Sequence, residues 1–335
     1  MTDSSDTEAV SGAAGRYDVA ADVRPLSLAD ASEVVRDLVE NVETVIVGKR
    51  TPIEHVVTTI LGRGHLLLED VPGVGKTMLA RTTAVSLAGE FKRVQFTPDL
   101  LPADITGVNV YNERNQEFEF KEGPIFANVV LADEINRAPP KTQSALLEAM
   151  EERQVTTDGV TRMLPDPFVV IATQNTVEQD RTYDLPAAEL DRFMKRVTIG
   201  YPNREEEVQV LERIVGGHPI DSVEPVTTAE TMRRARATAA QVEVAEPIQE
   251  YVARLAEYTR DRADLGASPR ASIDLLRACQ GRSVLEGRDY VIPDDVKAEA
   301  VPVLGHRIRA EAGDPVGGDE GREMVQRALE QVPPE

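Results

Sequence analysis

The sequence predicts an α/β fold in which a parallel-sheet core with inserted β-hairpins is followed by a smaller, all-helical domain. A chain of 335 residues, 41% of them hydrophobic, is long enough for two domains at the usual ~150 residues each. Short apolar runs alternate with helical or loop segments, which is typical of a buried parallel sheet. After residue 201 only helical periodicity remains. The predicted strands are residues 65–68, 93–96, 128–132, 168–173 and 196–199.

The N-terminal part predicts a tail and two helices. Residues 1–25 are small, polar and acidic without a sustained period, which indicates a disordered tail. Apolar residues at helical spacing then predict a helix over 28–43. Thr51 followed by Pro52 is an N-cap and first-turn signal for a second helix, which Gly62 ends.

Two hairpins are predicted as insertions in the core. Each is a pair of short segments with strand character, joined by turn residues. The second pair is joined by Asp158-Gly159, a strong signal for a two-residue hairpin turn. The strand pairs are 108–111 with 117–121, and 154–157 with 160–163.

The predicted boundary between the domains lies near residue 201, giving a core over 26–200 and a helical domain over 201–335. The first helix after the boundary has an apolar face that contains Val208 and Leu211, and Gly216-Gly217 ends it. The further predicted helices are 228–240, 247–262, 268–280, 293–304 and 319–331.

Composition excludes several classes of protein. A single cysteine, Cys279, excludes an internal disulfide framework and a cysteine-based zinc site. The four histidines are scattered without metal-ligand spacing. No apolar run approaches the ~20 residues needed to span a bilayer, and the N-terminus lacks the hydrophobic region of a secretion signal. We therefore expect a cytoplasmic, globular protein.

The charge balance argues against a nucleic-acid binder. The formal net charge is −21, whereas proteins that bind nucleic acid normally present a basic surface. Molar salt shortens the Debye length to about 3 Å and relieves such self-repulsion. The composition thus favours a salt-loving host, and a GC-rich genome is the alternative explanation.

The strongest chemical signal is the turn between the first strand and a helix predicted over 76–88. Gly73 and Gly75 permit backbone conformations that point N–H groups at phosphates, and the helix adds its positive end. Lys76 would reach the β and γ phosphates, and the hydroxyl of Thr77 would ligate Mg²⁺. The predicted cofactor-binding residues of this segment are Asp70, Val71, Pro72, Gly73, Val74, Gly75, Lys76, Thr77 and Met78.

This loop departs from the usual phosphate-binding pattern at its first position, which is Asp70 instead of glycine. The alternative interpretation is an ordinary glycine-rich turn. That alternative would leave the cation of Lys76 at a helix N-terminus, where it is unfavourable without an anion.

Two carboxylates follow the apolar strand 128–132. Asp133 and Glu134 come at the carboxyl end of the strand, where open α/β sheets bind ligands. Asp133 would hold Mg²⁺, and Glu134 would polarise the water that attacks the γ-phosphate. A solvated acidic loop is the alternative for this pair taken alone.

The two segments resemble the Walker A and Walker B motifs of AAA+ ATPases. The strings Leu67-Leu68-Glu69-Asp70-Val71-Pro72-Gly73, Asp133-Glu134-Ile135-Asn136-Arg137-Ala138 and Ala149-Met150-Glu151-Glu152 are similar to the MoxR subfamily in particular. The resemblance covers about residues 46–309 and extends to the aspartate at position 70. It implies a Mg²⁺-dependent ATPase that assembles as a hexameric ring. It also implies chaperone-like remodelling of a client, with a von Willebrand factor A domain protein as partner.

The same resemblance marks further catalytic candidates. Asn175 resembles the sensor 1 residue that contacts the γ-phosphate or orients the water, and a strand-end turn asparagine is its alternative. Arg192, in Leu190-Asp191-Arg192-Phe193, resembles the arginine finger that reaches a neighbouring subunit. Arg137 and Arg196 are rival candidates for that contact.

Two more positions complete the predicted site. Ser268 and Pro269 cap a helix and place Arg270 in its first turn, where a cation opposes the helix dipole unless an anion is present. Arg270 matches the family's sensor 2 position. Val47 and Gly48 resemble the segment that packs on adenine, with a plain turn between helices as the alternative.

Three other functions are consistent with part of this pattern. One alternative is the ATPase subunit of a metal-chelatase-like assembly. Another is a nucleic-acid motor, because related AAA+ proteins with similar inserts unwind DNA, although the acidic charge speaks against nucleic acid as a partner. A scaffold that binds ATP without hydrolysing it is disfavoured, because Lys76, Asp133 and Glu134 are all present.

Overall fold

The computed structural model describes residues 23–174, 183–215 and 217–334. The predicted tail lies outside these residues except for positions 23–25. The candidate Asn175 also lies outside them.

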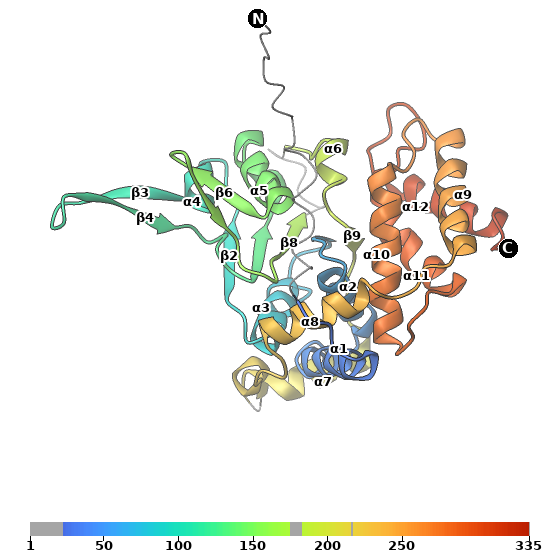
Figure 1. The fold of residues 1–335 in the computed structure, drawn as a ribbon, viewed down its shortest axis with the longest axis horizontal. Helices are drawn as coiled ribbons and strands as arrows, with labels where there is room; N and C mark the ends of the chain where they lie inside the picture. Colours follow the sequence, from blue (N-terminus) through green and yellow to red (C-terminus); the bar gives the residue numbers. More distant parts are fainter. Residues whose placement is uncertain (1–22, 175–182, 216, 335) are drawn as a thin grey trace, which may run out of the picture.

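The centre of the molecule is an all-parallel sheet of five strands, as predicted, and the structure adds their order, β2-β5-β8-β1-β9 (Figure 1). Leu67 of β1 is paired with Ala172 of β8 on one side and Arg196 of β9 on the other. The strands β1, β5 and β8 in the middle of the sheet are mainly apolar, as expected for strands whose residues are mostly buried. Their bounds are Leu66–Glu69 for β1, Phe91–Gln95 for β2, Val129–Asp133 for β5, Val169–Gln174 for β8 and Lys195–Val197 for β9.

Helices of the first 200 residues cover this sheet. The predicted helix over 28–43 is confirmed as α1. The predicted start of the next helix at Thr51-Pro52 was wrong, because α2 already begins at Arg50 and Lys49 occupies the N-cap position. The bounds are Leu28–Glu43 for α1, Arg50–Leu61 for α2, Lys76–Ser86 for α3, Pro102–Thr106 for α4, Ile135–Arg137 for η2, Pro140–Glu152 for α5 and Ala187–Leu190 for α6.

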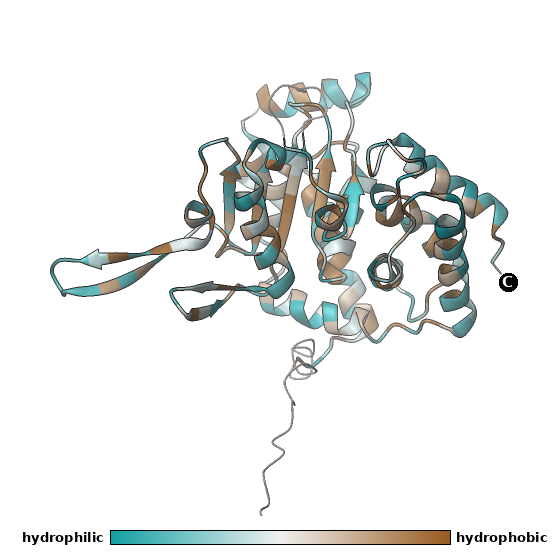
Figure 2. Cartoon of the chain, turned by 90° about the horizontal axis from the view of Figure 1, so that it is seen from above, coloured by the Kyte–Doolittle hydropathy of each residue, from teal (hydrophilic) through white to brown (hydrophobic). Residues whose placement is uncertain are grey.

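Both predicted hairpins are present and project from the same side of the sheet (Figure 2). They touch each other: Asn109 Nδ2 donates to Asp158 Oδ2 at 2.5 Å, and the guanidinium of Arg162 lies 3.7 Å from the centre of the Phe120 ring. Phe118 remains 73% exposed near the tip of the longer hairpin. The bounds are Gly107–Asn112 for β3, Glu117–Glu122 for β4, Gln154–Thr157 for β6 and Val160–Met163 for β7.

The part of the chain that the structure describes after β9 is helical, as predicted. The predicted helix 268–280 runs five residues further, to Leu285. None of the described residues of α7 is buried, so its apolar face, with Val208 and Leu211, is exposed. The bounds are Arg204–Val215 for α7, Pro219–Ser222 for η3, Ala229–Ala239 for α8, Glu246–Arg262 for α9, Pro269–Leu285 for α10, Pro293–Leu304 for α11, Gly305–Arg307 for η4 and Asp319–Gln331 for α12.

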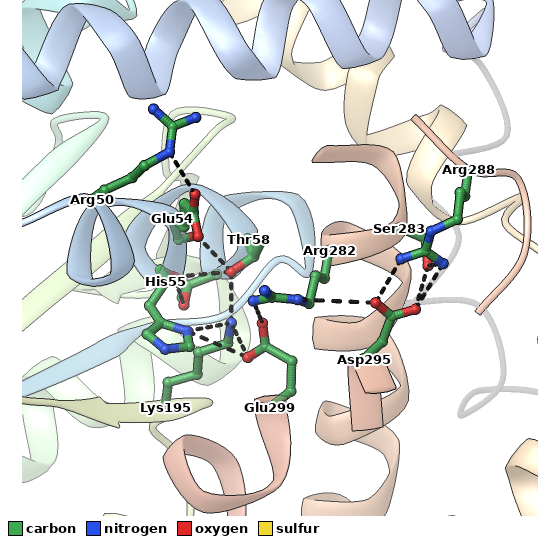
Figure 3. Close-up of polar contacts among 11 residues, drawn as sticks. Arg50, Glu54, His55, Thr58, Lys195, Arg282, Ser283, Arg288, Asp295 and Glu299 are labelled. Carbon is green, nitrogen blue, oxygen red and sulfur yellow. Dashed lines mark hydrogen bonds and ion pairs between the residues drawn. The ribbon is translucent and has the colours of Figure 1, made fainter. Parts of the chain in front are cut away.

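The helical domain packs tightly on the sheet domain. One hydrophobic cluster runs from α1, α2 and β1 through α8 to α12. A buried ion pair crosses the same junction, with Lys195 Nζ of β9 2.7 Å from Glu299 Oε2 of α11 (Figure 3). Lys195 also donates to Thr58 Oγ1 at 2.6 Å, and His55 Nδ1 lies 3.4 Å from Glu299. Both charged side chains of the pair are fully buried.

A second buried histidine, His65, joins α5 to the sheet. Its Nδ1 accepts the Val170 N–H at 2.9 Å, so its Nε2 donates to the Met150 carbonyl, 3.1 Å away. Burial and the nearby charge of Arg153 lower the pKa of His65 well below its usual value. The side chain is therefore held neutral, with both nitrogens satisfied.

We expect this histidine to make the fold sensitive to acid. Below about pH 6.5 the unfolded chain binds a proton at His65 that the folded chain does not bind. The free energy of unfolding therefore falls as the pH drops, by up to about 1.4 kcal/mol per pH unit from this residue. Urea unfolding between about pH 7.5 and 5.5 should show a shallower pH dependence in His65→Gln than in the wild type. The exposed His218→Gln is the control, and equal slopes for all three proteins would contradict the expectation.

Among the described residues, no helix combines the length and apolar character needed to cross a membrane.

Candidate active site

The loop after β1 forms an open cradle at the carboxyl edge of the sheet. Gly73 and Gly75 have φ angles of 87° and 93°, which favour glycine, and a Cβ added to either would meet no atom within 4 Å. The first turn of α3 has no side-chain cap, so its N–H groups remain available to an anion. Lys76 Nζ donates to the Asp70 carbonyl at 2.8 Å. This geometry fits a bound phosphate chain.

The side chain of Asp70 ties this loop to the strand at the edge of the sheet. Its Oδ1 accepts the Val71 N–H at 2.9 Å, and its Oδ2 accepts the N–H groups of Ile199 and Gly200, each at 2.7 Å. The carboxylate is buried against the end of β9, and only the backbone carbonyl of Asp70 contacts Lys76. The Asp70 carboxylate therefore fixes the phosphate loop to the chain at the end of β9, which a glycine at this position could not do.

Replacing Asp70 by alanine is expected to weaken both the fold and nucleotide binding. The change would leave the buried N–H groups of Ile199 and Gly200 without an acceptor, which should lower the free energy of unfolding by about 2–4 kcal/mol. Asp70→Asn keeps one oxygen that can accept both bonds and should cost clearly less. Urea unfolding and titration with a fluorescent ATP analogue measure the two effects. Equal losses in both variants would contradict the role assigned to the carboxylate.

The two predicted carboxylates lie at the same edge, two strands from the loop. Asp133 Oδ1 accepts the Thr173 hydroxyl at 2.6 Å, and its Oδ2 accepts from Arg93 at 2.7 Å. Glu134 adopts a left-handed conformation with φ of 56°, and its N–H donates to Thr173 Oγ1 at 2.9 Å. Thr173 is the second-to-last residue of β8, the strand between β5 and β1, so it holds the acidic pair on the side of the loop.

The carboxylate of Glu134 is held by two partners. Gln95 Nε2, at the end of β2, donates to Glu134 Oε2 at 2.6 Å, and Arg137 Nη1 donates to the same oxygen at 2.9 Å. Sequence reasoning missed Gln95 and assigned no role to Thr173. Both are polar residues within the last two positions of a strand, at the carboxyl edge of the sheet, which is the signal that could have marked them.

The donor set at this edge suits magnesium. Thr77 and Asp133 supply a hydroxyl and a carboxylate, the oxygen ligands that Mg²⁺ prefers, and phosphates usually complete its shell. Among the described residues, no group of three or more histidine, cysteine, aspartate or glutamate side chains is placed to hold a metal ion. Burial lowers the pKa of Lys76, while the carboxylates of Asp70, Asp133 and Glu134 oppose the shift. The lysine is thus electrostatically linked to the acidic pair.

The predicted adenine segment lies between α1 and α2. Val47 is buried, and Gly48 has a φ angle of 68°. The adjacent Lys49 donates to the Tyr201 carbonyl at 2.9 Å and lies 3.4 Å from Glu206, so the segment is fixed against the chain that follows β9. Contact of Val47 and Gly48 with a base stays a prediction.

Arg192 and Arg270 lie together, away from the loop. Both approach the carboxylate of Glu151 at the end of α5, Arg192 at 3.4 Å and Arg270 at 3.1 Å. The Met194 N–H donates to the His65 carbonyl, which places this cluster at the amino end of β1, whereas the loop follows the carboxyl end. Ser268 caps α10 as predicted, and the carboxylate beside Arg270 in this structure is that of Glu151, while the sensor 2 role of Arg270 stays a prediction.

The rival arginines occupy other positions. Arg137 lies beside Glu134 in its own chain. The side chain of Arg196 is only 7% exposed and lies 3.2 Å from Glu69, which Arg322 of α12 also approaches at 3.2 Å. Arg192 is 29% exposed. Of these three arginines, Arg192 combines accessibility with a place on the edge opposite the loop.

Comparison with known proteins agrees with this geometry. Residues 65–195 match the ATPase family associated with various cellular activities (AAA), and residues 255–328 match the AAA lid domain. The chain is 50% identical to the uncharacterised protein YeaC of Bacillus subtilis, over 83% of this chain and 88% of that protein. It is 43% identical to the chaperone MoxR1 of Mycobacterium tuberculosis, over 80% and 73% of the two chains. A crystal structure from Cytophaga hutchinsonii, described as a candidate ATPase, superposes with a TM-score of 0.83 at 36% identity, covering 91% of this chain and 96% of that chain.

Proposed function

This chain belongs to the MoxR family of AAA ATPases, and we propose that it hydrolyses MgATP at sites shared between neighbouring subunits of a ring. One observation carries the shared site. The phosphate loop and the acidic pair lie at one edge of the sheet, and Arg192 with Arg270 lies at the opposite edge. A single chain therefore cannot bring Arg192 to its own nucleotide, whereas a neighbour in a closed ring can.

Each residue then has one chemical task. The loop N–H groups and Lys76 hold the phosphates, and Thr77 with Asp133 orients Mg²⁺, which neutralises charge on the phosphate oxygens. Glu134 accepts the proton of the water that attacks the γ-phosphorus, after its carboxylate leaves Gln95 and Arg137. Arg192 of the neighbouring subunit stabilises the charge that develops in the transition state. We assign Asn175 to positioning the water.

We propose that hydrolysis drives remodelling of a client protein complex in the cytoplasm by a hexameric ring, with a von Willebrand factor A domain protein as partner. The chaperone relative supports this role. The two paired hairpins are the candidate contact surface, because they project from the sheet and carry exposed apolar side chains such as Phe118 and Met163.

The test is turnover as a function of protein concentration. The assay contains Mg²⁺ and molar KCl, since a net charge of −21 opposes assembly at low ionic strength. We expect turnover per subunit to rise with concentration as rings form. Co-expressed Glu134→Gln and Arg192→Ala subunits, each inactive alone, should recover part of the activity. Turnover per subunit that is independent of concentration, with no recovery in mixed rings, would refute the shared site.

A further inference from the structure

Arg307 of the helical domain binds the backbone of the segment that carries Arg192. It lies in η4, directly after α11, and its side chain is only 2% exposed. Its Nη2 donates to the backbone carbonyls of Asp191 at 3.1 Å and Phe193 at 2.8 Å, the residues on either side of Arg192. The same nitrogen lies 2.6 Å from Asp274 Oδ2 of α10, and Nε lies 3.3 Å from Asp191 Oδ1.

Two more residues of the helical domain hold the same segment. His306 Nε2 lies 2.9 Å from the Phe193 carbonyl. Ser268, the N-cap of α10, places its hydroxyl 3.0 and 3.2 Å from the two carboxylate oxygens of Asp191. The helix that Ser268 caps also carries Arg270, which meets Arg192 at Glu151.

These contacts have a mechanical consequence. A buried nitrogen such as Nη2 of Arg307, which contacts the carbonyls on both sides of Arg192, fixes the direction of the chain between them, and water cannot replace the lost bonds there. Any displacement of α10 and η4 must therefore carry the backbone of Arg192 with it. Such positions matter in catalysis, since a misplacement of about 1 Å can reduce a rate about 10²-fold.

We propose that Arg307 is a positioning residue for Arg192. Through its contacts, a change in the position of the helical domain moves Arg192, the arginine that reaches the neighbouring subunit. Arg307 itself touches no substrate. The proposal rests on the shared site proposed above, and it adds that the helical domain of one subunit sets the hydrolysis rate at the site of the next.

The test uses Arg307→Lys in full-length rings. Lysine keeps the charge, but its side chain is one atom shorter than that of arginine, so its ammonium cannot take the place of Nη2 between the two carbonyls and Asp274, and it has no Nε to approach Asp191. We expect kcat to fall about 10–100-fold, while the KM for ATP and the mass of the ring stay unchanged. A substitution that only loosened the fold would change ring mass or ATP binding as well.

Mixed rings assign the defect to one side of the interface. Arg307→Lys subunits keep an intact Glu134, and Glu134→Gln subunits keep an intact arginine segment. Co-expression of the two should raise turnover above that of either alone, whereas Arg307→Lys with Arg192→Ala should not. Recovery in rings of Arg192→Ala and Glu134→Gln, but not in rings of Arg307→Lys and Glu134→Gln, would overturn the role of Arg307. No recovery in either mixture would refute the shared site, and this inference with it.

A second variant covers the case in which Arg307→Lys does not fold. Ser268→Ala removes the contact with Asp191 together with a helix cap. Ser27→Ala, at the N-cap of α1, removes a matching cap far from Arg192 and is the control. We expect kcat to fall about 3–10-fold in Ser268→Ala alone, with similar small decreases in melting temperature in both. Equal kcat values in the two variants would overturn the proposal.

Discussion

Glutamine at position 134 is expected to lower kcat by about two to four orders of magnitude while ATP still binds. The substitution keeps the shape of the side chain and its ability to accept from Gln95 and Arg137. It removes the basic oxygen that takes the proton of the attacking water. Lys76, Thr77 and the loop glycines are untouched, so nucleotide affinity should persist. Single-turnover hydrolysis and ATP-analogue titration, run in parallel, separate the two effects.

The control for this change is Glu90→Gln, an exposed glutamate that directly precedes β2 at the far edge of the sheet. It makes the same chemical change away from the loop and should leave kcat within about twofold of the wild type. If Glu134→Gln retained more than about a tenth of the wild-type rate, another group would have to be the base.

The features that could be predicted from the sequence are those formed by residues adjacent in the chain. They include the phosphate loop, the pair Asp133 and Glu134, and the hairpin turn at Asp158-Gly159, whose residue types indicate their role before the fold is known. Gln95 and Thr173 are different, because their roles depend on the order β2-β5-β8-β1. No local pattern tells which strand becomes the neighbour of which.

The contacts around Arg192 show the same limit more strongly. Arg270 and Glu151 are 119 positions apart in the chain, and Arg307 and Phe193 are 114 apart. Sequence reasoning expected an anion beside Arg270 because of its place in the first turn of a helix, whereas the sensor 2 role that the resemblance implies for Arg270 stays a prediction. That reasoning could not identify Glu151 as the carboxylate beside Arg270, since only the folded chain brings the first turn of α10 to the end of α5.

The second large effect concerns the ion pair between Lys195 and Glu299, to which sequence reasoning assigned no role. Burial by itself raises the pKa of Glu299, but Lys195 and His55 outweigh it and bring that pKa to about 2. Removing one partner would leave the other charge buried and unpaired. We expect Glu299→Ala to lower the free energy of unfolding by about 3–5 kcal/mol. Urea unfolding in high salt measures it.

The matched control lies on the same helix. Asp294 and Lys297 form an exposed pair on α11, with 77% and 46% of their side chains accessible, so Asp294→Ala should cost no more than about 1 kcal/mol. Lys195→Met combined with Glu299→Leu should cost less than the sum of the two single changes, because no unpaired charge remains.

If Glu299→Ala cost no more than Asp294→Ala, the junction would be open in solution. A large cost would instead mean that α11 and β9 move as one body. Because η4 directly follows α11 and Arg192 lies just before β9, that rigidity is what transmission through Arg307 requires.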